Sequence, residues 1–207
     1  MNPQLQFSAR TSRVALVATT GIWLGAVCVG IALLTSYGNT PGPVSNNGPI
    51  WPTSSRLELS HHGATLVLFA HPHCPCTRAT LGELEKIAAT QADKLNCWVV
   101  FLKPASTEDG WDQTDLWTTA KAISGAHVVC DVDGVEARRF DATTSGQTIL
   151  YSQRGERIFS GGITLARGHS GDNAGRAAIE AYLKGGSLEY SQTPVFGCPL
   201  ETPGAAR

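Results

Sequence analysis

The chain has 207 residues, a formal net charge of −1 at neutral pH, 42% hydrophobic residues and only 16% charged ones. This length leaves room for one domain plus an anchor. The charges nearly cancel and no Lys/Arg cluster is present, so the sequence gives no sign of a nucleic-acid partner.

Residues 14–37 carry no charge and are mostly apolar. A bilayer core of about 30 Å needs about 20 helical residues, so this run predicts a transmembrane anchor with the lipid bilayer as its partner. Arg10 and Arg13 precede the run, and the next basic residue is Arg56. The positive-inside rule then places residues 1–13 in the cytoplasm and the globular part outside it, as in a single-pass protein of the inner or plasma membrane that faces the periplasm.

A cleaved signal peptide is the alternative for this segment, since it also begins with basic residues. No clear A-x-A-like cleavage site follows Leu34, which favours the uncleaved anchor. Residues 38–55 are rich in Pro, Gly, Asn and Ser, a composition typical of a flexible linker. We therefore expect a folded domain over residues 56–200 and a tail over residues 201–207.

Apolar runs and helical spacing predict strands that alternate with helices in this domain. The strands are expected at Leu66–Ala70, Cys97–Leu102, His127–Val132, Thr148–Ser152 and Glu156–Phe159. The helices are expected at Thr77–Thr90, Thr114–Ile123 and Ala174–Leu183. Strand–helix–strand units followed by a hairpin and a helix predict an α/β sandwich, in which helices flank a central mixed sheet.

The segment His71-Pro-His-Cys-Pro-Cys-Thr-Arg78 lies between the first strand and the first helix of this domain. The backbone N–H groups at a helix start are unpaired and carry partial positive charge, which favours a thiolate over a thiol. Cys74 and Cys76 are therefore expected to have lowered pKa values and to act as nucleophiles or metal ligands.

The sequence Phe-Ala-His-Pro-His-Cys-Pro-Cys-Thr-Arg-Ala, followed by a helix, resembles the strand–CxxC–helix of the thioredoxin-like superfamily. The resemblance covers about residues 57–184 and is nearest to the membrane-tethered, extracytoplasmic members. It implies a thioredoxin-like sandwich behind the anchor. This motif, together with Gly161–Thr164 and Arg167–Asn173, also resembles proteins labelled RedB-type.

Two features depart from the thioredoxin pattern. Thr77 stands at the usual position of the second cysteine, so that Cys76 comes one residue early. The segment Thr144–Thr148 lacks the proline that thioredoxins place beside the active thiol. The resemblance thus supports the fold more strongly than it supports exchange with protein disulfides.

Thiol–disulfide exchange is the first hypothesis for this motif, with a protein or a small thiol or disulfide as substrate and no cofactor. Cys74 attacks, Cys76 resolves the mixed disulfide, and His71 and His73 supply positive charge and protons. Arg167 and His169 lie in a Gly-rich loop that is expected to return toward the thiols. The candidate catalytic residues are therefore Cys74, Cys76, His71, His73, Arg78, Arg167 and His169.

Other hypotheses remain open. Copper or zinc binding is the main alternative, because His73, Cys74 and Cys76 offer imidazole and thiolate ligands. A resemblance to thioredoxin-fold copper-delivery proteins implies His169 as a further ligand. A thiol peroxidase is a third hypothesis, in which Arg78 stabilises a Cys76 thiolate. A non-enzymatic binding module is a fourth. The alternative without chemistry is that the two cysteines are small buried residues, or a stable disulfide that staples a loop.

Three further cysteines lie outside the motif. Cys97 and Cys130 fall on strands that are expected to be neighbours, and buried packing is the role we assign to them. Cys198 follows Val-Phe-Gly in what reads as a mobile tail, and it is a candidate resolving thiol.

Overall fold

The computed structural model describes residues 3–43, 45–46, 48–91 and 94–200, with side chains from residue 12 onward. It divides into a helix, α1 (Pro3–Asn39), and a compact domain that starts at Thr40. Within the described residues, Ser12–Asn39 is the one helical stretch long and apolar enough to cross a membrane, with a mean hydropathy of 2.1 over its most apolar 18 residues. An apolar helix is thus confirmed where the anchor is predicted.

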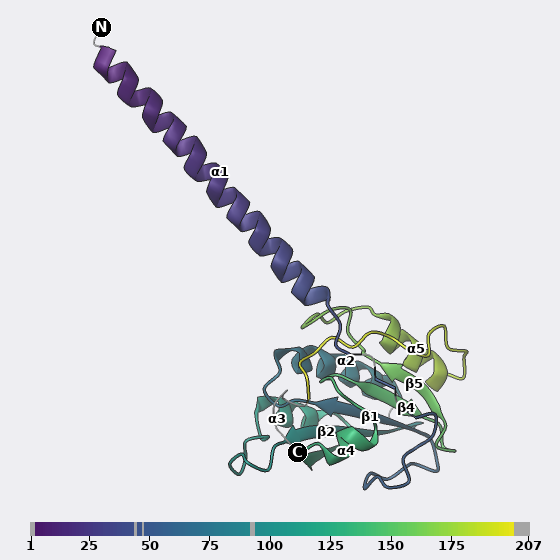
Figure 1. The fold of residues 1–207 in the computed structure, drawn as a ribbon. Helices are drawn as coiled ribbons and strands as arrows, with labels where there is room; N and C mark the ends of the chain where they lie inside the picture. The colour runs from purple at the N-terminus through teal and green to yellow at the C-terminus, as the bar shows by residue number, and fades with distance from the viewer. Residues whose placement is uncertain (1–2, 44, 47, 92–93, 201–207) are drawn as a thin grey trace. The chain divides into compact units, whose positions relative to one another are not determined.

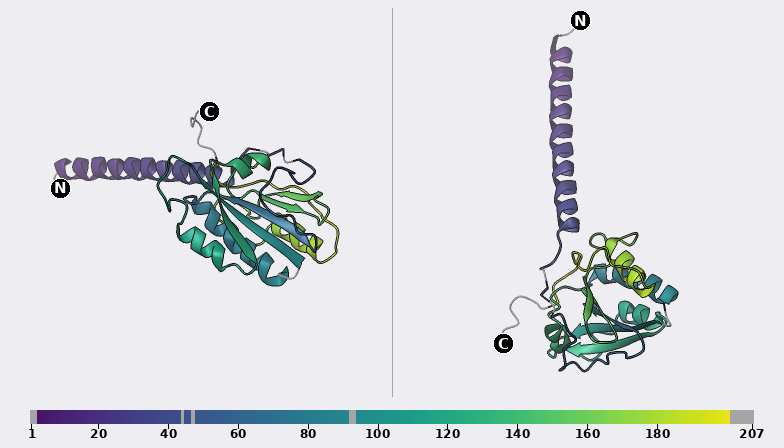
Figure 2. Two further views of the ribbon diagram at one scale, coloured as in Figure 1. Left: turned by 90° about the horizontal axis from the view of Figure 1, so that it is seen from below. Right: turned by 90° about the vertical axis from the view of Figure 1, so that its right-hand side faces the viewer.

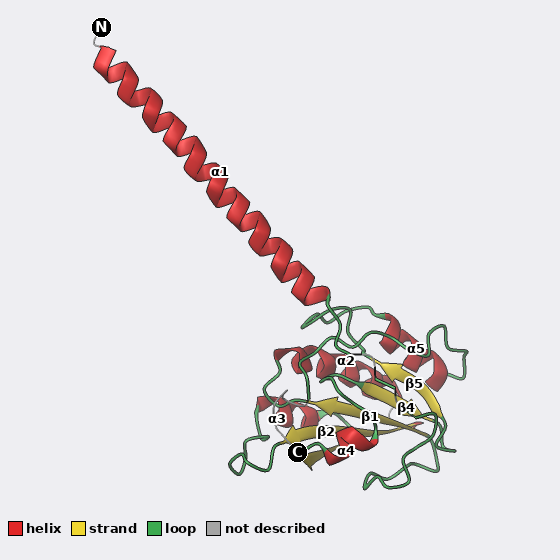
Figure 3. Cartoon of the chain, viewed as in Figure 1, coloured by secondary structure: helices red, strands yellow, loops and turns green. Residues whose placement is uncertain are grey.

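The domain is built on a five-stranded mixed sheet with the strand order β3-β2-β1-β4-β5 (Figures 1 and 3). The strands are β1 (Ala64–Ala70), β2 (Leu95–Lys103), β3 (Ala126–Val132), β4 (Thr148–Tyr151) and β5 (Arg157–Gly161). The first three are parallel to one another, while β4 runs antiparallel to both β1 and β5. The predicted α/β sandwich is therefore confirmed.

Alternation along the strands divides the core between the two faces of the sheet. On β1, Leu66 and Leu68 point to one face, which is covered by α2 (Pro75–Gln91), α3 (Asp115–Ala122) and α5 (Ala174–Leu183). Val67 and Phe69 point to the other face. That face is covered by α4 (Val135–Arg139), by Trp51 to Leu59 and by Leu200. Figure 2 shows these layers from two further directions. Buried on both faces, β1 is apolar at nearly every position.

Helix α4 is not predicted from the sequence, because five residues are too short to show a helical period. The start of α4 is held by hydrogen bonds to a residue of the preceding strand, β3. The carboxylate of Asp131 accepts hydrogen bonds from the backbone N–H groups of Glu136 at 2.8 Å and Ala137 at 2.9 Å. Gly134 adopts a left-handed conformation with φ of 66° at the turn.

The predicted linker differs from the structure, because its described residues from Thr40 onward belong to the compact domain. The N–H of Gly42 donates to the carbonyl of Val195 at 2.8 Å, and that of Trp51 donates to Gly155 at 2.7 Å. The Trp51 ring also packs edge-on against Phe140, with centroids 5.0 Å apart. These partners come from distant parts of the chain, so local composition does not reveal them. The predicted tail, residues 201–207, lies outside the described residues.

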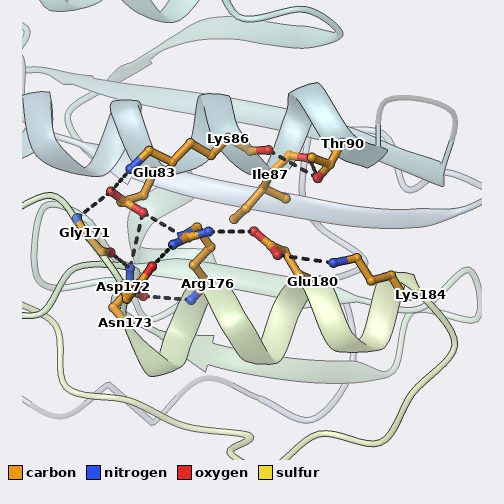
Figure 4. A network of polar contacts seen from close by, with 10 residues as sticks. All are labelled: Glu83, Lys86, Ile87, Thr90, Gly171, Asp172, Asn173, Arg176, Glu180 and Lys184. Carbon is orange, nitrogen blue, oxygen red and sulfur yellow. Dashed lines mark hydrogen bonds and ion pairs between the residues drawn. The ribbon is translucent and has the colours of Figure 1, made fainter.

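A polar network ties α5 and the loop before it to α2 (Figure 4). Its centre is Glu83, a fully buried carboxylate on α2. Glu83 pairs with Arg176 of α5 at 2.8 Å and with Lys86 at 2.7 Å, and it accepts a hydrogen bond from the N–H of Gly171 at 2.9 Å. The network anchors the end of the loop that carries Arg167 and His169.

Candidate active site

Cys74 lies at the turn between β1 and α2, directly before Pro75, the first residue of the helix. Its N–H donates to the carbonyl of His71 at 3.1 Å, and its own carbonyl accepts from the N–H of Thr77 at 3.0 Å. Proline suits the first helical position, since the N–H it lacks would have no partner in the helix. The position expected for Cys74, at the start of a helix, is therefore found in the structure.

The Cys74 sulfur is the most buried of the thiols in the motif, with 1% of the residue exposed. Burial alone raises the pKa of a thiol. Hydrogen bonds from four donors outweigh the effect of burial here and lower the pKa of Cys74. The donors are the thiol and the backbone N–H of Cys198, and the backbone N–H groups of Cys76 and Thr77. Donors that point at a thiolate stabilise its charge, so Cys74 is the thiol of this site whose ionisation the surroundings favour.

The other two thiols of the cluster stay protonated. Burial, the charge of Cys74 and a hydrogen bond to its sulfur raise the pKa of Cys76. Burial and the same two interactions with Cys74, together with the charge of Cys76, raise the pKa of Cys198 to about 12. The site therefore combines one thiol of lowered pKa with two thiols of raised pKa, a division that the sequence motif does not reveal.

Arg167 is the cation of this thiol cluster. It follows β5 in the loop, is half-buried, and donates a hydrogen bond to the carbonyl of Gly197. Its charge opposes the rise in the pKa of both Cys76 and Cys198. The structure thus brings Arg167 to the thiol cluster, as expected for the loop that carries it. There its charge acts on Cys76 and Cys198, the two thiols that interact with Cys74.

Ser145 lies in the segment that precedes β4. It is 1% exposed, and its hydroxyl lies 2.9 Å from both the N–H of His71 and the hydroxyl of Thr77. Its own N–H donates to the carbonyl of Cys198 at 2.8 Å. Ser145 thus links the cysteine turn to the C-terminal segment, a role that sequence reasoning missed because a lone serine carries no pattern.

The two histidines pack on Trp111 from the loop before α3. The ring centroids of His73 and Trp111 are 4.5 Å apart, and those of His71 and Trp111 are 5.6 Å apart. The His73 Nε2 lies 3.1 Å from the Trp111 carbonyl oxygen. Burial and the charge of His73 lower the pKa of His71, so that His71 is neutral at neutral pH and does not supply the positive charge expected of it.

The remaining candidates lie away from the thiols. Arg78 forms an ion pair with Asp115 at the surface, where both side chains are more than half exposed. His169 is exposed, and its Nδ1 lies 2.8 Å from the carbonyl oxygen of Arg167.

The proposed metal ligands do not come together as one set. No group of three or more His, Cys, Asp or Glu side chains suited to a metal ion is found in the described part of the chain. The rings of His73 and His169 are turned to backbone carbonyls of Trp111 and Arg167. The residues present therefore do not fit the predicted His-x-His-Cys-x-Cys centre.

Cys97 and Cys130 lie on the adjacent strands β2 and β3, as predicted. Cys97 is buried, and burial raises its pKa to about 12, which makes it an inert packing residue. Cys130 is exposed, so its predicted buried role is wrong. Strand β3 is at the edge of the sheet, where alternate side chains reach solvent.

No protein-family model and no curated protein matches the chain. Among solved structures, an uncharacterized conserved protein from Geobacillus kaustophilus has a TM-score of 0.60 at 17% identity, over 82% of this chain and 96% of that one. A hypothetical protein from Sinorhizobium meliloti 1021 has a TM-score of 0.57 at 23% identity, over 80% of this chain and 96% of that one. A secreted Mycobacterium tuberculosis disulfide oxidoreductase is a looser match, with a TM-score of 0.44 at 14% identity, over 61% of this chain and 84% of that one.

The topology decides the fold class. Parallel strands joined by α2, an antiparallel hairpin beside β1 and a closing helix α5 are arranged as the sequence resemblance implied. The domain has a thioredoxin-like fold. Cys74 lies at the turn between β1 and α2 of this fold.

Proposed function

We propose that this protein is a membrane-tethered, extracytoplasmic thiol–disulfide oxidoreductase in which Cys74 is the attacking thiolate and Cys76 a resolving thiol. One observation carries the proposal: four hydrogen bonds lower the pKa of a buried cysteine at a helix start, with two further thiols against it. A thiolate with thiols beside it is the arrangement that exchange requires. We also propose that the chain is related to the RedB-type proteins that its motif resembles.

The exchange balances within the cysteines and the substrate. The Cys74 thiolate attacks one sulfur of a substrate disulfide, forming a mixed disulfide and releasing the other sulfur as a thiolate. The Cys76 sulfur then attacks Cys74, and its proton passes to the departing substrate sulfur. The protein gains one disulfide and the substrate becomes two thiols. The reverse sequence oxidises a dithiol substrate, and neither direction needs a cofactor.

The substrate is a protein or small-molecule thiol or disulfide. In the reduced protein, oxidised glutathione is expected to convert Cys74, which lies in the tryptic peptide 57–78, to a disulfide with glutathione or with another cysteine of the site, as read by mass spectrometry. A peptide of that segment alone, which lacks the fold, is the control and is expected to react more slowly at pH 7. Equal rates in the two would contradict the proposal, because the fold would then confer no reactivity.

The topology of the anchor gives a separate prediction. A reporter that is active only outside the cytoplasm, fused after Arg207, is expected to be active, since Arg10 and Arg13 precede the apolar helix. Changing both arginines to Glu is expected to reduce that activity. Activity of a cytoplasm-specific reporter at the same position would contradict the extracytoplasmic assignment.

A further inference from the structure

We propose that Cys198, carried by the C-terminal segment, is a second resolving thiol of this site and forms a disulfide with Cys74. This inference rests on the proposed exchange function and names a partner for Cys74 outside the Cys-Pro-Cys motif. Cys198 is far from Cys74 in sequence, and the fold brings the two together.

The segment from Pro194 to Leu200 is docked on the domain, in contrast to the mobile tail expected from its composition. The N–H of Ser145 donates to the carbonyl of Cys198 at 2.8 Å, and the N–H of Leu200 donates to the carbonyl of Thr143 at 2.9 Å. Leu200 is 2% exposed and belongs to the core cluster on the α4 side of the sheet. The backbone hydrogen bond at Cys198 itself and the buried side chain of Leu200, two residues later, hold the Cys198 thiol at the site.

Gly197 lets the segment approach this closely. A Cβ atom at this position would overlap the carbonyl oxygen of Ser145, which only a residue without a side chain avoids. The carbonyl of Gly197 in turn accepts the hydrogen bond from Arg167. Contacts to Ser145 and Arg167 therefore fix the residue directly before Cys198.

The contacts place Cys198 directly against the nucleophile. Both its thiol and its backbone N–H hydrogen bond with the Cys74 sulfur. A disulfide needs the two sulfurs at about 2.05 Å, a short approach from hydrogen-bond contact. Cys76 is only two residues from Cys74 and can pair with it only through a small ring, which is strained and easily reduced. Cys198 comes from another segment and is free of that ring.

The step balances as follows. A mixed disulfide joins Cys74 to a substrate sulfur. The Cys198 sulfur attacks the Cys74 sulfur, the Cys74–substrate bond breaks, and the departing substrate sulfur takes the proton of Cys198. Cys74 and Cys198 are oxidised by two electrons together, and the substrate disulfide is reduced to two thiols. A dithiol reductant returns both cysteines to thiols.

The test oxidises the full chain with oxidised glutathione, blocks free thiols, digests with trypsin and maps disulfides by mass spectrometry. Cys74 lies in peptide 57–78 and Cys198 in peptide 185–207, because the nearest cleavage sites are Arg56, Arg78, Lys184 and Arg207. A Cys74–Cys198 disulfide therefore links two peptides, whereas a Cys74–Cys76 disulfide stays within one. We expect the linked pair, and we expect it to persist in Cys76→Ser and to vanish in Cys198→Ser.

Kinetics add a second readout. Cys76→Ser is expected to release bound glutathione through Cys198, while the double variant Cys76→Ser/Cys198→Ser is expected to keep it at least tenfold longer. Gly197→Val, which leaves all cysteines in place, is expected to lower the yield of linked peptides at least tenfold. Gly82→Ala is its matched control, since a Cβ there meets only ordinary contact distances, and it is expected to leave the yield unchanged.

The outcomes separate this inference from the proposed function. Disulfide confined to peptide 57–78 in the wild type, with none linking it to peptide 185–207, overturns the role of Cys198 and leaves the exchange proposal standing. Failure of glutathione to oxidise Cys74 at all overturns both.

Discussion

Replacing Cys74 by Ser is expected to lower the rate of reaction with a small disulfide, such as oxidised glutathione, by about 1,000-fold or more. A hydroxyl does not attack a disulfide. Burial, which does not depend on Cys74, still raises the pKa values of the remaining thiols of the cluster, Cys76 and Cys198. The rate is measured at pH 7 by the release of reduced glutathione from the full chain.

Cys130→Ser is the matched control for this variant. It removes one thiol from an exposed site on the edge strand, and it is expected to leave the rate within a factor of two. If Cys74→Ser kept most of the activity, the nucleophile would be Cys76 or Cys198, and the assignment of roles within the cluster would be wrong.

Replacing Glu83 by Ala is expected to lower the free energy of unfolding by about 3 kcal/mol. Glu83 is fully buried, and its removal leaves Arg176, whose side chain is 18% exposed, without its most buried partner. The N–H of Gly171 loses its acceptor at the same time. Breaking one side of a buried ion pair is costly, because the other charge stays out of water. Urea unfolding of the full chain, followed by tryptophan fluorescence, measures the change.

Glu85→Ala on the same helix is the control. Glu85 is exposed, so its loss is expected to change the free energy of unfolding by no more than about 0.5 kcal/mol. Equal effects of the two substitutions would contradict the structural role of the Glu83 network. Because this network anchors the Arg167 loop, Glu83→Ala is also expected to slow exchange, whereas Glu85→Ala is not.

The sheet and its three longer covering helices were predictable because their signals are local. Apolar runs mark β1 and β2, and helical spacing of Leu81, Leu84 and Ile87 marks α2. Helix α4 was not predictable, since it depends on the Asp131 carboxylate and a left-handed glycine rather than on a period.

The position of Cys74 was predictable from the strand–turn–helix pattern alone. The roles of its neighbours were not. That Cys198 interacts with Cys74, as Cys76 does, depends on how the C-terminal segment pairs with residues 143–145, a contact between parts of the chain far apart in sequence. The metal hypothesis used adjacency in sequence for His73, Cys74 and Cys76, but in the structure the His73 ring is turned to the Trp111 carbonyl while the two cysteines interact with each other.

The linker and the segment around Cys198 show the same limit of composition. Pro, Gly, Asn and Ser predict flexibility because they form neither a helical nor a strand pattern. Here the described residues of both segments find partners on the domain: Gly42 at Val195, and Cys198 at Ser145. Glycine at position 197 is required for this close approach and not for mobility.

The central claim is that Cys74 is the thiolate of the site, and the pH dependence of alkylation tests it most directly. The reduced full chain is labelled with iodoacetamide between pH 5 and 10, and fragment ions assign the label to each cysteine. Because the pKa of Cys74 is lowered and those of Cys76 and Cys198 are raised, labelling of Cys74 is expected to reach its plateau at the lowest pH of the three. A plateau for Cys76 or Cys198 at lower pH than that for Cys74 would contradict the account.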